Sequence, residues 1–297
     1  MKRLIYIAKT LESDKDAKGH LYGKKVFDQL HDHFGSRLKL ITNSHNNIWC
    51  RDYMPIRNGR GDLVQFSYAP SYLMGSVKGR KTIPEPREIH QELGLKNVSF
   101  SEIILDGGNV ELRGKKAIVT DRVFRDNNKI NLVKKKELVA ELIEWLAVDT
   151  LILIPQYPYD FTGHVDGLIR FVDERTVLIN DFTQELIDTV LDPNSYRQKI
   201  MDQWHHSFMN VLLSSGLKIK TLPYTASLEN GTTSAQGVYL NFLELDDRIV
   251  MPTFGDKAND KEAARRLEAL YRKPVQRIEA TELSQKGGVI NCVTWVG

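Results

Sequence analysis

The sequence repeats one succession of elements, and this repetition limits the fold more than any single motif does. A helix is followed by a short apolar strand, a polar loop and then a pair of strands. The predicted helices cover Asp16–Phe34, Glu85–Leu93, Asn131–Ala147, Gln184–Ser215 and Lys257–Arg272, and the strands after them cover residues 37–42, 98–105, 150–154, 217–222 and 275–279. The third helix has the clearest helical periodicity, and Pro193 is expected to break or kink the fourth.

The strand pairs follow these single strands. Four pairs are complete, at residues 47–68, 109–121, 166–181 and 237–254, whereas a fifth, at residues 287–296, shows only its first strand. We expect the apolar stretch at residues 3–8 to supply the missing partner. That pairing would leave no open edge between the first and last units.

Equivalent positions in the five units are spaced almost regularly. They are marked by Arg51, Gly107, His164, Asn241 and Cys292, at steps of 56, 57, 77 and 51 residues. A period of roughly 50 to 60 residues that carries a helix and strands is typical of a ring or solenoid of α/β modules. The alternative is an α+β domain whose elements merely alternate. We expect residues 1–297 to form a single domain.

Composition narrows the function classes. The chain has 41 basic and 38 acidic side chains, and this near balance does not favour a nucleic-acid partner. Its N-terminal apolar run is only four residues, shorter than a signal peptide needs, and no apolar run approaches the roughly 20 residues of a membrane span. The sequence therefore predicts a cytoplasmic globular protein with neither a nucleic-acid nor a membrane partner.

Reactive side chains gather in the loops that enter the strand pairs. The motifs are W-C-R-D at residues 49–52, D-G-G-N at 106–109, G-H-V-D-G at 163–167 and G-G-V-I-N-C at 287–292. Equivalent positions in a ring of repeats converge near its axis, so these motifs are expected to share one pocket. On a strand, His164 and Asp166 would point to the same face and flank one ligand.

A cysteine, a histidine and several aspartates suit nucleophilic catalysis on an electron-poor carbon. Cys292 would attack as a thiolate, His164 would move the proton, and one aspartate would orient the histidine ring. The remaining carboxylates would repel each other unless a cation lay between them. A planar guanidinium fits, because it donates two parallel hydrogen bonds to a carboxylate.

These motifs, in this order, resemble the signatures of the guanidine-modifying penteins, and most closely those of the agmatine deiminase and bacterial-type peptidylarginine deiminase family. Residues 239–263 add a fifth match. The resemblance implies a five-fold pseudo-symmetric α/β propeller of ββαβ-type units. It also implies hydrolysis of a guanidine to a urea with release of ammonia, through a covalent thiouronium and without a metal or cofactor.

The resemblance also implies a role for each site residue. The implied catalytic residues are the nucleophile Cys292, the general acid/base His164, and Asp106, which would hold the histidine. Asp52 and Asp166 would bind the guanidinium. Trp49 would line the pocket, and Asn241 would be a further pocket residue.

The substrate's tail is left open, because the sequence departs from the family at Tyr53-Met54-Pro55 and at residues 66–81. Agmatine is favoured over peptidyl-arginine, arginine or a guanidino acid, although Arg57, Arg60 and Arg80 are available to bind a carboxylate. Amidino transfer to or from a small guanidine and a non-catalytic pentein binding module are also compatible with the motifs. The oligomeric state is open, with a homodimer as one option. Cys50 is interpreted as a packing residue, with a redox or modulatory role as the alternative.

Overall fold

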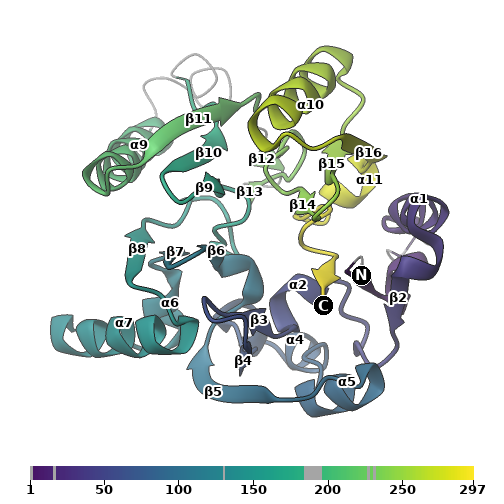
Figure 1. Cartoon of the computed structure of the whole chain (residues 1–297), viewed down its shortest axis with the longest axis horizontal. Coiled ribbons are helices and arrows are strands. Elements are labelled where there is room, and N and C mark those ends of the chain that lie inside the picture. The colour runs from purple at the N-terminus through teal and green to yellow at the C-terminus, as the bar shows by residue number, and fades with distance from the viewer. Residues whose placement is uncertain (1–2, 16–17, 130, 184–195, 226–227, 230–231) are drawn as a thin grey trace. The chain divides into compact units, whose positions relative to one another are not determined.

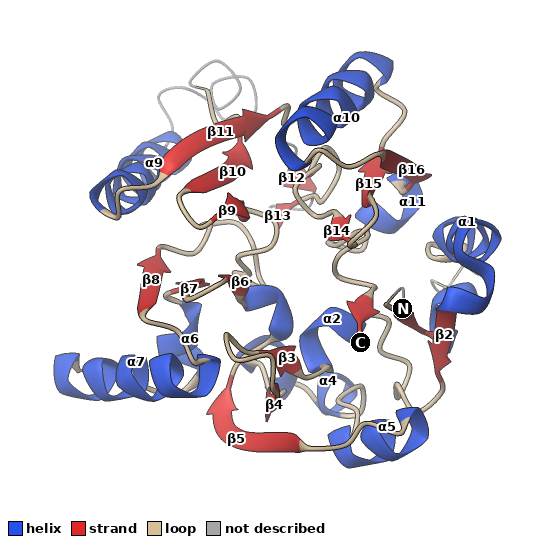
Figure 2. Cartoon of the chain, viewed as in Figure 1, coloured by secondary structure: helices blue, strands red, loops and turns tan. Residues whose placement is uncertain are grey.

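Short three-stranded sheets recur along the chain and alternate with helices (Figure 2). The computed structural model describes residues 3–297 except 16–17, 130, 184–195, 226–227 and 230–231. It divides into a first unit, made of Met1–Arg51, Lys81–Leu95 and Leu222–Gly297, and a second unit, made of Asp52–Arg80 and Lys96–Thr221. No helix among the described residues is long and apolar enough to cross a membrane.

The second unit holds three of these sheets. Their strands are β3 (Ile56–Arg57), β4 (Leu63–Ser67) and β5 (Val98–Ile104); β6 (Glu111–Arg113), β7 (Lys116–Thr120) and β8 (Thr150–Ile154); and β9 (Ile169–Asp173), β10 (Thr176–Asn180) and β11 (Lys218–Leu222). In each sheet the first two strands form an antiparallel hairpin. The third strand of the first two sheets runs parallel to the hairpin's second strand. Parallel neighbours cannot be joined by a tight turn, so a long connection is required there.

The first unit repeats this arrangement twice. Its strands are β14 (Leu243–Glu244), β15 (Ile249–Thr253) and β16 (Val275–Glu279); β17 (Trp295–Val296), β1 (Ile5–Ala8) and β2 (Leu38–Ile41); and a small hairpin of β12 (Leu228–Glu229) and β13 (Thr232–Thr233). The N-terminal strand β1 pairs antiparallel with β17, with Ile5 opposite Val296, and parallel with β2. This confirms that the N-terminal strand completes the last strand pair.

The longer helices agree with the predicted ranges apart from the start of the first, and the predicted start of the fourth, at Gln184, lies outside the described residues. They are α1 (Lys24–Phe34), α5 (Pro86–Leu93), α7 (Leu132–Leu146), α9 (Tyr196–Ser214) and α10 (Lys257–Tyr271). The predicted start at Asp16 is wrong, because Lys15 forms a β-bridge with Leu21 and the helix begins only at Lys24. The predicted break at Pro193 lies outside the described residues.

Short helices complete the chain. The α-helices are α2 (Cys50–Tyr53), α3 (Ser71–Met74), α4 (Val77–Arg80), α6 (Arg122–Asp126) and α11 (Thr281–Ser284), and the 3-10 helices are η1 (Lys9–Glu12), η2 (Gly35–Arg37) and η3 (Gly107–Asn109).

Helix α7 shows how one element is specified locally and then buried. The side chain of Asn131 accepts a hydrogen bond from the Lys134 N–H and caps the N-terminus, and Ala147 ends the helix in the left-handed conformation. One face of the helix buries Leu138, Leu142 and Leu146. These leucines join the apolar residues of β4, β5 and β7 in one core cluster of the second unit. Figure 1 shows the ribbons of α7 and of these strands.

Leu142→Ala should destabilise the protein by about 2–5 kcal/mol, because Leu142 is fully buried and the substitution leaves a cavity. The matched control is Leu132→Ala on the same helix, where the side chain is 68% exposed and the expected change is within about 0.5 kcal/mol. Urea unfolding of both variants measures the difference. Equal losses would contradict the assignment of the buried face.

Candidate active site

The sequence motifs lie just before the first strand of a pair, as predicted. Helix α2 precedes β3, the 3-10 helix η3 precedes β6, and turns precede β9 and β17. The strands themselves begin later than predicted. His164 and Asp166 are not on a regular strand, because the N–H groups of Leu168 and Ile169 both donate to the Val165 carbonyl and form a turn. The regular strand predicted at this motif is therefore absent.

His164 nevertheless lies among three carboxylates in the second unit. Its Nε2 is 2.9 Å from Asp106 Oδ2, and its Nδ1 is 3.5 Å from Asp52 Oδ1. Asp166 is close enough for its charge to act on His164. All four side chains are at least 93% buried. The second unit thus brings together four of the seven predicted site residues.

Gly108 allows this close approach. Its N–H donates to Asp52 Oδ1 at 3.1 Å, and its carbonyl accepts from the Asp166 N–H at 3.1 Å. A Cβ atom at this position would lie 2.6 Å from both Asp52 Oδ1 and His164 Nδ1. Only glycine leaves room for the backbone beside the carboxylate and the imidazole.

Burial and charge shift the pKa of two members of the cluster. Burial opposes the charged form of His164, but the negative charge of Asp52 and the hydrogen bond to Asp106 outweigh it and raise the pKa of His164 to about 10. Burial raises the pKa of Asp52 to about 7, although the His164 charge acts in the opposite direction. The cluster therefore stabilises an imidazolium at neutral pH and carries an excess of acidic groups.

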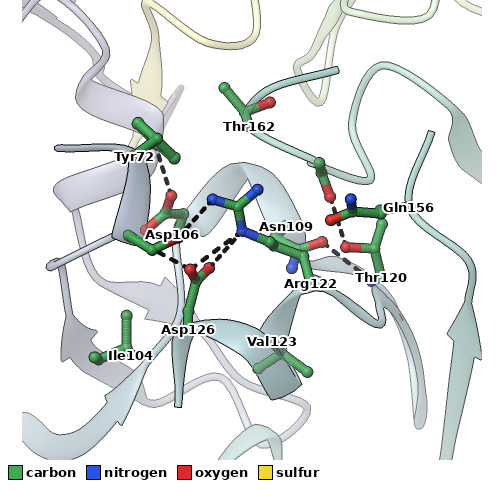
Figure 3. Close-up of polar contacts among 12 residues, drawn as sticks. Tyr72, Ile104, Asp106, Asn109, Thr120, Arg122, Val123, Asp126, Gln156 and Thr162 are labelled. Atoms are coloured by element: carbon green, nitrogen blue, oxygen red, sulfur yellow. Dashed lines mark hydrogen bonds and ion pairs between the residues drawn. The ribbon is translucent and has the colours of Figure 1, made fainter. Parts of the chain in front are cut away.

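Two residues that the sequence analysis did not single out complete this cluster (Figure 3). The Tyr72 hydroxyl donates to Asp106 Oδ2 at 2.8 Å. Arg122 pairs with Asp126 and donates to the Ser71 hydroxyl at 2.9 Å. The bonded residues lie 34 and 51 positions apart in sequence. No short-range pattern could have indicated these contacts.

The other three predicted residues lie in the first unit. The Asn241 side-chain oxygen accepts from the Cys292 N–H at 3.2 Å. A Cβ atom added to Gly288 would lie 2.7 Å from the Trp49 ring and 3.0 Å from Cys292 Sγ, so both side chains pack against this glycine. Trp49, Asn241 and Cys292 therefore gather around one short stretch of backbone.

The two cysteines have different environments and form no disulfide. Cys50 is fully buried, and its thiol contacts the carbonyls of Val293 at 3.0 Å and Tyr6 at 3.4 Å. Cys292 is only partly buried. This agrees with the interpretation of Cys50 as a packing residue. Among the residues that the structure describes, no group of three His, Cys, Asp or Glu side chains is arranged to hold a metal ion.

A family model described as Porphyromonas-type peptidyl-arginine deiminase matches residues 3–296. The chain belongs to this family. Similar proteins include an agmatine deiminase of Ectopseudomonas mendocina, 26% identical over 86% of this chain and 76% of the relative. Membership of the family agrees with the resemblance that the four motifs indicate.

Solved structures share the mixed α/β fold. A C. jejuni agmatine deiminase variant with substrate bound has a TM-score of 0.75 at 16% identity, over 99% of this chain and 93% of that chain. A putative arginine deiminase from Porphyromonas gingivalis has a TM-score of 0.72 at 19% identity, over 100% of this chain and 95% of that chain. At these identities the likeness concerns the fold.

His164 should make stability depend on pH. Its folded-state pKa is raised from 6.5 to about 10, so its stabilisation is complete below pH 6.5 and is lost as the pH rises toward 10. Between about pH 7 and about pH 9, the free energy of unfolding of the wild type should fall relative to that of His164→Gln by roughly 1 kcal/mol per pH unit. Urea unfolding at each pH tests this. A constant difference between the two proteins would contradict it.

Proposed function

We propose that this protein is a guanidine deiminase that hydrolyses agmatine to N-carbamoylputrescine and ammonia. The observation that carries the proposal is His164, buried between the carboxylates of Asp52 and Asp106 with Asp166 nearby. Membership of a deiminase family supports the same reaction class, and the similar proteins include agmatine deiminases.

The charge of the cluster favours a cationic substrate. Three aspartates surround one histidine, so full ionisation would leave two negative charges in excess in a buried place. The raised pKa of Asp52 reflects this excess, since burial and the charges of Asp106 and Asp166 all disfavour its ionised form. A guanidinium bound by Asp52 and Asp166 would supply the missing positive charge and offer planar donors to both carboxylates.

The proposed chemistry is covalent. Cys292 Sγ attacks the guanidinium carbon as a thiolate, and ammonia leaves with a proton from His164, which produces a thiouronium. His164 then removes a proton from water as the water attacks the same carbon. The C–S bond breaks, the thiolate is restored and the ureido product leaves. Asp106 orients His164, while Trp49 and Asn241 line the nucleophile's surroundings.

Three features support a five-fold α/β propeller built as one catalytic domain over residues 1–297. Five three-stranded sheets lie within the described residues, four of them begin with an antiparallel hairpin, and in the fifth β1 pairs antiparallel with β17. We propose this propeller as the architecture of the chain. Cytoplasmic location, a homodimer and the absence of a nucleic-acid partner remain predictions from sequence.

Peptidyl-arginine is the second candidate substrate, because the matching family model carries that name. A panel of agmatine, arginine, guanidinobutyrate and an arginyl peptide separates the candidates. We expect ureido product and ammonia from agmatine, and activity on the peptide instead would reassign the substrate within the same chemistry.

Cys292→Ala should reduce turnover to background, because it removes the proposed nucleophile. Cys50→Ala is the matched control and should keep turnover, since the buried Cys50 thiol contacts the carbonyls of Tyr6 and Val293 and has no part in the proposed chemistry. A haloacetamidine should label Cys292 and spare Cys50, as located by peptide mass spectrometry. Full turnover by Cys292→Ala would refute the covalent mechanism, and absence of both turnover and labelling would favour a non-catalytic binding module.

Substrate binding should strengthen as the pH rises through about 7, because Asp52 pairs with a guanidinium only after it ionises. KM for agmatine should fall about 10-fold between about pH 6 and about pH 8, as expected for one ionisation centred near 7. Asp52→Asn should bind weakly and without this pH dependence. Asp62→Asn, at a nearby exposed carboxylate, should keep the wild-type profile. A KM independent of pH in the wild type would contradict the role of Asp52.

A further inference from the structure

We propose that Tyr72 is a positioning residue for His164 and acts through Asp106. The inference rests on the proposed function, which gives His164 the proton-transfer role. Tyr72 lies on α3, within the stretch of residues 66–81 where the sequence departs from the family pattern. Its role follows from its contacts.

Asp106 is held through one oxygen atom. Oδ2 receives the Tyr72 hydroxyl at 2.8 Å and faces His164 Nε2 at 2.9 Å. Oδ1 is buried and has no hydrogen-bond partner among the residues that the structure describes. Without the Tyr72 hydroxyl, the His164 ring would be the only described side chain bonded to this carboxylate. A buried carboxylate with so few donors is costly, so its orientation depends on Tyr72.

This arrangement determines which nitrogen of His164 carries a proton in the contact with Asp106. An ionised carboxylate can only accept hydrogen bonds, so Nε2 must carry a proton when it bonds to Asp106. Nδ1 is then the nitrogen that is left to give and take a proton, and it faces Asp52 at 3.5 Å. The Tyr72 hydroxyl is a second donor to Oδ2 and keeps the Asp106 carboxylate oriented toward Nε2. Nε2 therefore stays bonded to Asp106, and Nδ1 stays the nitrogen that transfers protons.

The Tyr72 ring is held on several sides. The Arg122 guanidinium lies 5.5 Å from the ring centroid, and the rings of Phe161 and His164 contact it edge-on. Arg122 is 3% exposed and also donates to the Ser71 hydroxyl and to the Phe161 carbonyl, both at 2.9 Å. Figure 3 shows Arg122 and Asp126 beside Tyr72 and Asp106. One buried cation therefore ties α3 to the loop that leads into His164.

The hydroxyl remains a donor over the pH range in which such an enzyme would work. Burial is the main cause, and together with the charge of Asp106 it raises the pKa of Tyr72 well above its ordinary value. The hydrogen bond to Asp106 is thus not lost by ionisation of the tyrosine.

Tyr72→Phe tests the proposal, because it removes the hydroxyl and keeps the ring. With histidine labelled with ¹⁵N, we expect the His164 Hε2 proton to exchange with water at least about 10-fold faster than in the wild type. We also expect kcat for the guanidine substrate to fall about 10-fold with KM changed less than about 2-fold, since proton transfer is affected and binding is not. Ser71→Ala, which loosens α3 but keeps the hydroxyl, should give smaller changes in the same direction.

Tyr239→Phe is the matched control. It removes the buried hydrogen bond from Tyr239 to Asp260 at 2.8 Å, which has the same chemistry but no histidine, and it should leave the Hε2 exchange of His164 unchanged. If a folded Tyr72→Phe variant has the wild-type Hε2 exchange rate and the wild-type kcat, the positioning role of Tyr72 is refuted, whereas the proposed function stands. Faster exchange in a protein that turns over no guanidine would support the positioning of His164 and overturn only the proposed function.

Discussion

The parallel pairing between the second and third strands of a sheet is the constraint on which this structure depends. Strands β7 and β8 run side by side in the same direction, so the chain must cross the sheet between them, and α7 provides that crossing. The same holds for β15 and β16 with α10. The first strand of each hairpin follows a loop, so a turn or a short helix precedes each of these sheets. The reactive residues lie in these turns and short helices.

The second unit buries several ionisable side chains together around His164. A histidine and three aspartates are buried together, which would be costly if each group were isolated. The cost is offset because His164 is charged and lies between two carboxylates, while the pKa of Asp52, raised to about 7, keeps part of that carboxyl group protonated at neutral pH. Such an unbalanced cluster is typical of a site that is completed by a cationic ligand. Gly108 supports it by letting the backbone contact both ring and carboxylate.

Sequence patterns predicted the helices well and the local structure of the motifs less well. Asn131 and Ala147 bound α7 because capping depends on near neighbours in the chain. The strand predicted through Cys50 is instead the short helix α2, and the strand predicted through His164 is a turn. At these positions, buried polar groups need hydrogen-bond partners, and this requirement determines the backbone conformation. Those partners are distant in sequence. Alternation of apolar and polar residues carries no information about them.

The order of the modules, the extent of α7, the pairing of the N-terminal strand with the last motif and the residue types for guanidine chemistry could all be predicted from the sequence. The extent of α7 follows from periodicity and capping, which are local, whereas the others follow from the order of repeats and motifs along the chain. Tertiary contacts were needed to bring His164 Nε2 to 2.9 Å from Asp106 and Nδ1 to 3.5 Å from Asp52, to place Gly108 against the ring, and to bond Tyr72 to Asp106. These contacts join residues that are at least 34 positions apart in the sequence, and no local pattern of residue types specifies which of them will meet.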